Sequence, residues 1–322
     1  MSMKNRITGP LLSLRMFRLE EFIGLWFTIF VVLGSGFFTL KSLVNPGPES
    51  PHIIFSTLRI LLSIGFIIGF YKLTIQRASN DQFRWIRDFA PFLFVLAIFM
   101  NLHNTIALIN QHDFHHTLAG LDASIFGVQP SQWVEQFYHP RLTDWFALAY
   151  VNYYLITPVL LFLLYRQNSH AEFREIMLTM MISYYIGFVG YIIFPAASPY
   201  IVMPEIYQVD IWKDTSLVSR LVRFIVGLSP DRVRDAFPSM HNGITFLTMI
   251  FAWRFHRKFF WIQLPLAISL VVATIYLRYH FVVDILAGVI VVALSFYLTP
   301  RLVNYWERSV NKDQKQMSME NI

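Results

Sequence analysis

The chain has 322 residues, of which 55% are hydrophobic, 17% aromatic and only 14% charged. Soluble globular domains carry about 25% charged residues, so this composition excludes an ordinary soluble protein and indicates a polytopic membrane protein. The formal net charge of +6 is modest, and the lack of cysteine excludes disulfide bonds and thiolate metal sites.

Apolar segments of about 20 residues, long enough to cross a bilayer, recur along the whole chain. They predict an all-α fold with about eight transmembrane helices. The expected spans are residues 22–40, 53–71, 90–110, 145–165, 176–196, 241–253, 259–277 and 281–299. The sixth is short, and the basic residues after it are expected to reach the membrane surface. No signal-peptide cleavage site precedes the first, which is therefore expected to be retained.

The connection between the third and fourth spans, residues 111–143, predicts an amphipathic helix in the membrane interface. Its apolar residues at helical spacing are Phe114, Leu118, Leu121 and Ile125. A metal site is the alternative, because His112, Asp113, His115 and His116 lie in the same stretch. Adjacent histidines point in different directions on a helix, so no metal is expected, and no other cofactor.

The distribution of basic residues predicts the orientation of these spans. The N-terminal tail, the connections 72–89 and 166–175, the turn 254–258 and the C-terminal tail together hold 17 of the 26 Lys and Arg residues. The opposite side holds eight, and the remaining one, Arg59, lies within the second span. Basic residues concentrate on the cytoplasmic side, so both termini are predicted to be cytoplasmic.

These expectations divide the chain into five regions. A cytoplasmic tail (1–21) leads into N-terminal transmembrane helices (22–110), followed by an extracytoplasmic interfacial segment (111–143). A catalytic membrane core (144–300) precedes a second cytoplasmic tail (301–322).

Two polar motifs flank a pair of apolar segments in the core, which returns both motifs to the extracytoplasmic side. The first runs from Asp235 to His241, and the second from Leu277 to Asp284. His280 and Asp284 are four residues apart, a spacing that places two helical side chains on one face. The carboxylate would fix one imidazole nitrogen and leave the other free as a nucleophile.

His241 supplies a second imidazole, from another segment, that could protonate a leaving oxygen. Ser239 and the amides after it lie where a helix begins, and helix N-termini bind anions. Together these groups predict phosphoryl transfer through a phosphohistidine. The alternative is a structural His280–Asp284 pair with His241 as an ordinary interfacial histidine.

Pro-Ser-x-His followed 39 residues later by His-x-x-x-Asp resembles the second and third signature motifs of the type 2 phosphatidic acid phosphatase superfamily. That superfamily includes lipid phosphatases, inositol phosphorylceramide synthase and vanadium haloperoxidases. The resemblance implies a six-helix phosphatase-like core. It also implies roles for His280 as nucleophile, Asp284 as its orienting partner, His241 as general acid and Ser239 as a phosphate ligand.

Two phosphate-binding cations of the family pattern are replaced here. Tyr200 stands where a related branch has an arginine, and Thr274 stands where the third motif usually has another. Arg278, one helical turn after Thr274, could reach back to the same oxygens, or it could simply anchor the span. Arg234, just before the Ser239 motif, is a further candidate phosphate ligand within an otherwise mixed-charge loop.

Polar residues also interrupt the third and fourth spans. Asn101, His103 and Asn104 are either functional or form hydrogen bonds between helices. Asn152, Tyr153 and Tyr154 interrupt the fourth span, and with Tyr184 and Tyr185 they could line a head-group pocket or serve as interfacial packing.

The sequence therefore predicts an integral membrane lipid phosphatase or phosphotransferase that passes a phosphoryl or phospho-head-group unit to water or an alcohol. The spacing of the spans resembles the inositol phosphorylceramide synthase-like branch. The expected partners are the membrane, a phospholipid or lipid phosphate substrate and an alcohol acceptor; nucleic acid is not expected. The alternative is a non-catalytic lipid-binding or transport protein that retains the fold.

Overall fold

The computed structural model describes residues 17–46, 53–77, 84–227 and 234–320. In these residues the structure is helical apart from connections and an isolated β-bridge between Ala196 and Asp235. The elements are α1 (Leu19–Val44), α2 (Ile53–Arg77), α3 (Arg84–Ile109), α4 (His115–Phe126), α5 (Pro130–Trp133), η3 (Val134–Phe137), α6 (Pro140–Val151), α7 (Tyr153–Arg166), α8 (His170–Ile193), α9 (Pro199–Val202), η4 (Pro204–Ile206), α10 (Leu217–Gly227), α11 (Met240–Phe255), α12 (Arg257–Tyr276) and α13 (Val282–Glu320).

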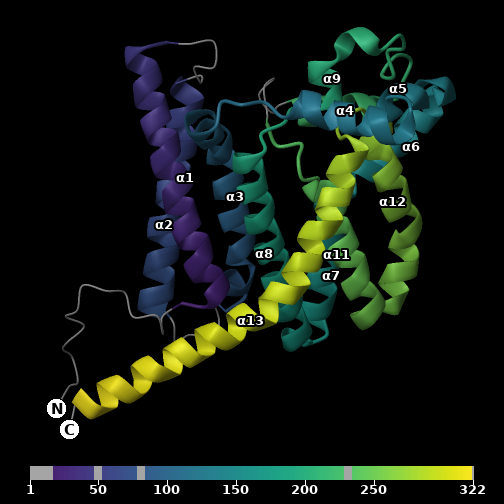
Figure 1. Cartoon of the computed structure of the whole chain (residues 1–322). Coiled ribbons are helices and arrows are strands. Elements are labelled where there is room, and N and C mark those ends of the chain that lie inside the picture. The colour runs from purple at the N-terminus through teal and green to yellow at the C-terminus, as the bar shows by residue number, and fades with distance from the viewer. Residues whose placement is uncertain (1–16, 47–52, 78–83, 228–233, 321–322) are drawn as a thin grey trace.

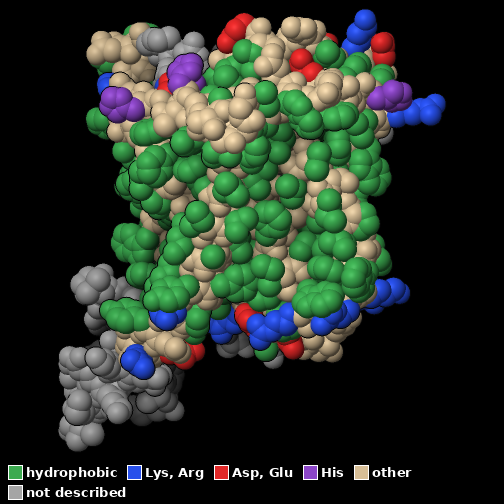
Figure 2. Space-filling model, turned by 45° about the vertical axis from the view of Figure 1, so that its right-hand side comes forward, with side chains coloured by type: hydrophobic (Ala, Val, Ile, Leu, Met, Phe, Trp, Pro, Cys, Tyr) green, Lys and Arg blue, Asp and Glu red, His purple; other side chains and the backbone are tan. Residues whose placement is uncertain are grey.

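The long helices confirm the predicted all-α, polytopic membrane architecture. Among the described residues, six helices are long and apolar enough to cross a bilayer, and the bent pair α6–α7 makes a seventh if it is one span. The short segment predicted at 241–253 is α11, which has only 16 residues. Figure 2 shows the hydrophobic side chains forming a broad band between two ends where the charged side chains gather.

The expected span at 145–165 is broken. α6 and α7 meet at Asn152 with a bend of 44°. The Asn152 side-chain amide donates to Gln263 Oε1 on α12 at 2.9 Å, so the break is fixed to a neighbouring helix.

Helices α1, α2 and α3 stand together beside the remaining bundle (Figure 1). Asn101 donates to Ser63, and Asn104 donates to Ser35 and Ser56. These bonds link α3 to both neighbours. Asn101 and Asn104 therefore form the helix-to-helix hydrogen bonds that were one of the two predicted roles, and His103 forms none of them.

The core consists of α6, α7, α8, α11, α12 and α13, and two glycines allow α11 and α13 to approach closely. A Cβ on Gly288 would lie 2.5 Å from the Ser239 carbonyl oxygen, and a Cβ on Gly243 would lie 3.2 Å from the Gly288 carbonyl oxygen. Larger residues would separate the helices. This crossing brings the two polar motifs into contact at one end of the bundle.

Short elements cover that end. α4 lies across it, roughly perpendicular to the long helices (Figure 1), as expected of an interfacial helix. The stretch before α11, described from the sequence as a mixed-charge loop, contains α9, η4 and α10 among its described residues.

Candidate active site

His280 and Asp284 form the predicted pair, but not on a continuous helix. His280 lies two residues before α13 begins, and Asp284 lies in the first turn of α13. Asp284 Oδ2 accepts from the backbone amide of Phe281 at 2.8 Å and lies 3.3 Å from His280 Nδ1. Both side chains are buried. The carboxylate therefore holds the histidine and the turn that carries it.

The surroundings of His280 define its tautomer. Nδ1 also lies 2.9 Å from the carbonyl oxygen of Ala236. A carbonyl can only accept a hydrogen bond, so Nδ1 carries the proton. In the neutral imidazole Nε2 then has the free lone pair, which is the state that a nucleophile needs.

His241, in the first turn of α11, faces this lone pair. Its Nδ1 lies 3.3 Å from His280 Nε2, and its Nε2 lies 2.9 Å from the Tyr150 hydroxyl. With Nε2 of His280 unprotonated, Nδ1 of His241 is the donor, and Tyr150 donates to the other side of the His241 ring. Tyr150 in α6 thus orients the second histidine, a role that no pattern around residue 150 indicates.

Two of the tyrosines that the sequence singled out surround the same imidazole. The rings of Tyr153 and Tyr154 lie 4.4 and 6.4 Å from that of His241, centre to centre, and the Tyr153 hydroxyl bonds to that of Tyr184. Tyr185 instead packs on Phe27 of α1. Three of the four tyrosines therefore belong to the neighbourhood of His241.

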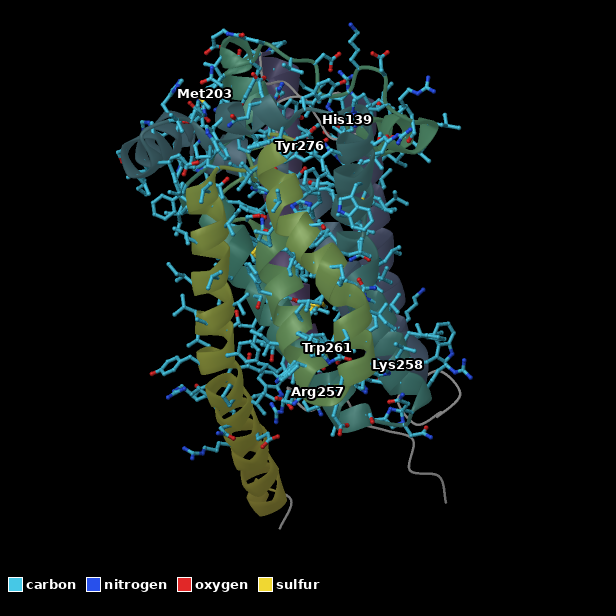
Figure 3. All side chains as sticks on the ribbon, turned by 90° about the vertical axis from the view of Figure 1, so that its right-hand side faces the viewer. His139, Met203, Arg257, Lys258, Trp261 and Tyr276 are labelled. Carbon is cyan, nitrogen blue, oxygen red and sulfur yellow. The ribbon has the colours of Figure 1, made fainter. Side chains whose placement is uncertain are left out.

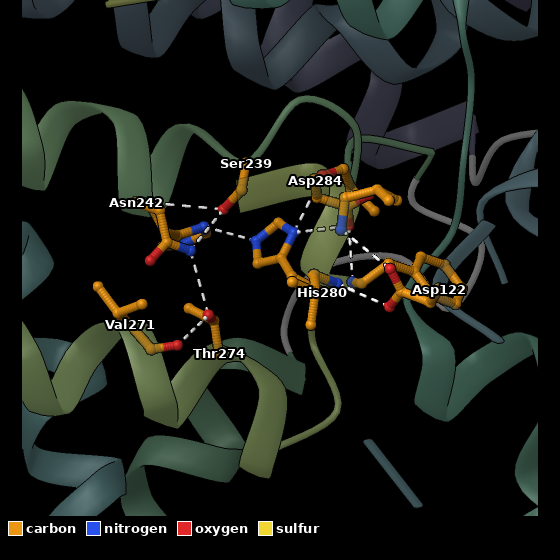
Figure 4. Close-up of polar contacts among 12 residues, drawn as sticks. Asp122, Ser239, Asn242, Val271, Thr274, His280 and Asp284 are labelled. Carbon is orange, nitrogen blue, oxygen red and sulfur yellow. Dashed lines mark hydrogen bonds and ion pairs between the residues drawn. The ribbon is translucent and has the colours of Figure 1, made fainter. Parts of the chain in front are cut away.

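Ser239 caps the N-terminus of α11 and is fully buried (Figure 4). Its Oγ accepts from the side-chain amide of Asn242 at 3.0 Å, and the same amide donates to Thr274 Oγ1 at 3.1 Å. Thr274, where the family pattern has a cation, is therefore tied to the cap by hydrogen bonds. The role of Ser239 as a phosphate ligand stays a prediction.

Arg278 does not occupy the helical position assumed for it. The Thr274 carbonyl accepts from the amides of Tyr279 and His280, α12 ends at Tyr276, and Arg278 has a left-handed φ of +64°. Its Nη2 donates to Glu135 Oε1 at 2.5 Å. Because the helix ends first, Arg278 does not lie on the helix face from which a reach back was expected, and its guanidinium is directed to η3; its role as a phosphate ligand stays a prediction.

Arg234, the other predicted phosphate ligand, lies on the α4 side of the site. Its Nε pairs with Asp113 Oδ1 at 3.0 Å. The rings of His115 and His116 pack together, 4.4 Å apart between centroids, although their adjacency predicted divergent directions. In the described part of the chain, no group of three or more His, Cys, Asp or Glu side chains is arranged to hold a metal ion.

Two further carboxylates lie beside the histidines. Burial raises the pKa of Asp235, in the loop before α11, to about 6, and the nearby His280 opposes this shift. Asp122 in α4 accepts from the amides of Val282 and Val283 at 2.8 and 3.0 Å (Figure 4). Burial raises the Asp122 pKa, and these bonds oppose the rise. Asp122 thus caps α13 from a segment 160 residues away, a role invisible in the sequence.

Asp122→Ala is expected to lower the free energy of unfolding by about 1–2 kcal/mol, the usual effect of losing a helix cap, because two amides of α13 lose their acceptor. Asp122→Asn, which keeps one acceptor oxygen, should lose less, and Ser124→Ala on the exposed side of α4 should lose nothing. Thermal unfolding in detergent measures all three. An Asp122→Ala protein as stable as the wild type would contradict the capping role.

Fold and site together define a polytopic membrane protein with a His–His–Asp cluster at the end of the bundle that the short elements cover, in which His280 and Asp284 are buried and His241 is partly buried. A family model described as the PAP2 superfamily matches residues 116–298, more than half of the chain. The chain therefore belongs to the PAP2 superfamily, which supports a phosphatase-like function on lipids. The match contains both histidines, Asp284 and Ser239, and leaves out α1–α3. No curated protein and no solved structure matches the chain.

Proposed function

We propose that the protein transfers a phosphoryl or phospho-head-group unit from a lipid to water or an alcohol through a phosphohistidine at His280. One observation carries this proposal. A directed series of hydrogen bonds runs from Tyr150 to His241 to His280, and the far nitrogen of His280 is held by Ala236 and Asp284. The unprotonated Nε2 of His280, as a nucleophile requires, faces the protonated Nδ1 of His241, as a general acid requires.

The steps follow from this arrangement. Nε2 of His280 attacks phosphorus, the bond to the leaving oxygen breaks, and His241, which enters this step as the imidazolium, gives that oxygen its Nδ1 proton and becomes neutral. Asp284 stabilises the positive charge on His280. Water or an alcohol then attacks phosphorus, His241 takes its proton, and the P–N bond breaks. Since His241 contacts Nε2 directly, its ring must rotate aside as phosphorus takes that place.

Purified protein in a panel of defined phospholipids tests the function, with free phosphate and lipid products followed separately. Phosphate release would identify a phosphatase, and a new phospho-alcohol product would identify a transferase of the inositol phosphorylceramide synthase kind. Lipid binding without turnover of any panel member would contradict the proposal and favour the non-catalytic lipid-binding alternative.

We further propose that the site faces the extracytoplasmic side and that both termini are cytoplasmic. Arg257, Lys258 and Trp261 lie at the end of the molecule opposite the cap, as Figure 3 shows, where basic and aromatic anchors of a cytoplasmic surface are expected. Gln167, beside His256 and thus next to Arg257, and Lys213, whose carbonyl accepts from Tyr138 after η3, are both exposed and lie at opposite ends. Single cysteines at these two positions should react with an impermeant reagent from opposite sides. Labelling from one side would contradict this orientation.

A further inference from the structure

α10 has one face buried against the protein and an opposite, apolar face that is exposed. Ser219 and Val222 are buried, whereas Leu217, Leu221 and Phe224 on the other side are 74%, 55% and 64% exposed. The exposed residues follow the spacing of one helical face. A short helix in water would not leave such a face uncovered, but a helix in the lipid head-group layer would direct it into the acyl chains.

The attachment of α10 places this face beside the lipid-facing side of the core. Asp144 Oδ1, near the start of α6, accepts from the Ser216 amide at 2.9 Å and from the Ser219 hydroxyl. The next residue, Trp145, and Leu148 one turn later are both exposed. Tryptophan is enriched where membranes meet water. The apolar face of α10 is therefore attached beside exposed apolar residues of the core at the membrane interface. The lipid bilayer is the partner that covers this face.

Two arginines lie next to the apolar face of α10, both on the same side of it. Arg220 and Arg223 are both exposed, on the side of the helix between its apolar and buried faces. This is the arrangement of an interfacial helix that attracts anionic lipid.

Arg223 also lines a cavity of about 450 Å³, with Tyr200, Tyr207, Trp212, Arg278 and Tyr279 among the other lining residues. The Arg278 guanidinium is already bound by Glu135 and the Val209 carbonyl. Arg223 lies 5.8 Å from the Trp212 ring centre, and no acidic side chain of the described residues pairs with it. Arg223 is therefore the cation of this cavity that an incoming anion can bind.

The cavity adjoins the candidate active site through two aromatic rings. The ring centre of Tyr279, in the cavity wall, lies 4.8 Å from that of Tyr150, whose hydroxyl bonds to His241. Tyr279 also directly precedes His280 in the chain. A head group bound in the cavity would thus lie one layer of side chains from the histidines.

We propose that α10 is seated in the extracytoplasmic leaflet and that Arg223 binds the phosphate of a phospholipid there and directs its head group into the adjoining cavity. This inference rests on the proposed function for the identity of the lipid as substrate. Arg223 would be a phosphate-binding cation from outside the family motifs. Two phosphate-binding cations of those motifs are replaced in this chain, by Tyr200 and Thr274.

The seating of α10 is testable without any activity. Because the chain has no cysteine, Phe224→Cys can carry an environment-sensitive dye in the full-length protein, reconstituted in phosphatidylcholine–phosphatidylglycerol nanodiscs. Its emission should shift to the blue and be quenched by lipids spin-labelled on the acyl chain. The same dye on Lys213→Cys, in the exposed loop before α10, should do neither. A dye at residue 224 that behaves as if in water would overturn the seating.

The role of Arg223 is tested against its neighbour on the same helix. Arg223→Ala should raise KM for a bilayer phospholipid about tenfold, the effect of losing one charged hydrogen bond, with kcat little changed. Arg220→Ala should leave KM within about twofold, and Arg223→Lys should recover part of the loss. Equal increases in both alanine variants would show general charge attraction and overturn the assignment. Wild-type protein inactive on every lipid would instead count against the proposed function, while the dye still reports on α10.

Discussion

His280→Ala is expected to abolish the covalent phospho-enzyme, whereas His241→Ala should still form it from a donor whose leaving group needs no proton. Of the two histidines, only His280 has its Nδ1 held by a carbonyl and a carboxylate, which leaves its Nε2 unprotonated and available for attack. His241 presents a proton, and general acid catalysis contributes about 10² to 10⁴ in rate. For His241→Ala, transfer from a lipid should therefore fall by that factor, and transfer from an activated aryl phosphate much less.

Rapid quench with a labelled lipid and with a labelled aryl phosphate measures acid-labile label on each variant. Tyr150→Phe, which leaves both imidazoles and removes one donor to His241, should form label from either donor. Two results would contradict the assigned roles: label retained in His280→Ala, or the same dependence on leaving group in the two alanine variants.

The second large effect is expected for Asp284→Asn, which should lower turnover by about 10²- to 10⁴-fold with little loss of folded protein. The Ala236 carbonyl also accepts from Nδ1 of His280, at 2.9 Å, and so preserves the tautomer in the variant. The loss of turnover therefore reports how much the negative charge of Asp284 stabilises the cationic imidazole in the proposed phosphohistidine.

Steady-state turnover and the folded fraction after size-exclusion chromatography separate the two effects. Glu175→Gln removes a carboxylate from the Arg254 ion pair at the other end of the molecule and should leave turnover unchanged. Near-normal turnover by folded Asp284→Asn protein would show that the carboxylate is structural.

The class of protein and the central pair of motifs follow from the sequence alone. The apolar segments predict a polytopic helical membrane protein because a bilayer demands long apolar helices. The Ser239–His241 and His280–Asp284 motifs predict a site because their spacing places polar groups at the same end of neighbouring helices. Such properties depend on residues close together in the chain, so local pattern is sufficient to find them.

Other features depend on where helices end and on which segments pack together, and only the tertiary structure decides them. α12 ends at Tyr276, and this termination directs Arg278 to Glu135, 143 residues away, instead of along the helix face. Tyr150 and Asp122 likewise reach the site from α6 and α4. The two glycines that let α11 and α13 cross are visible in the sequence, but their partners are not. The sequence by itself determined the membrane class and which two histidines and aspartate lie together, whereas the supporting contacts came from packing between distant segments, which no local spacing encodes.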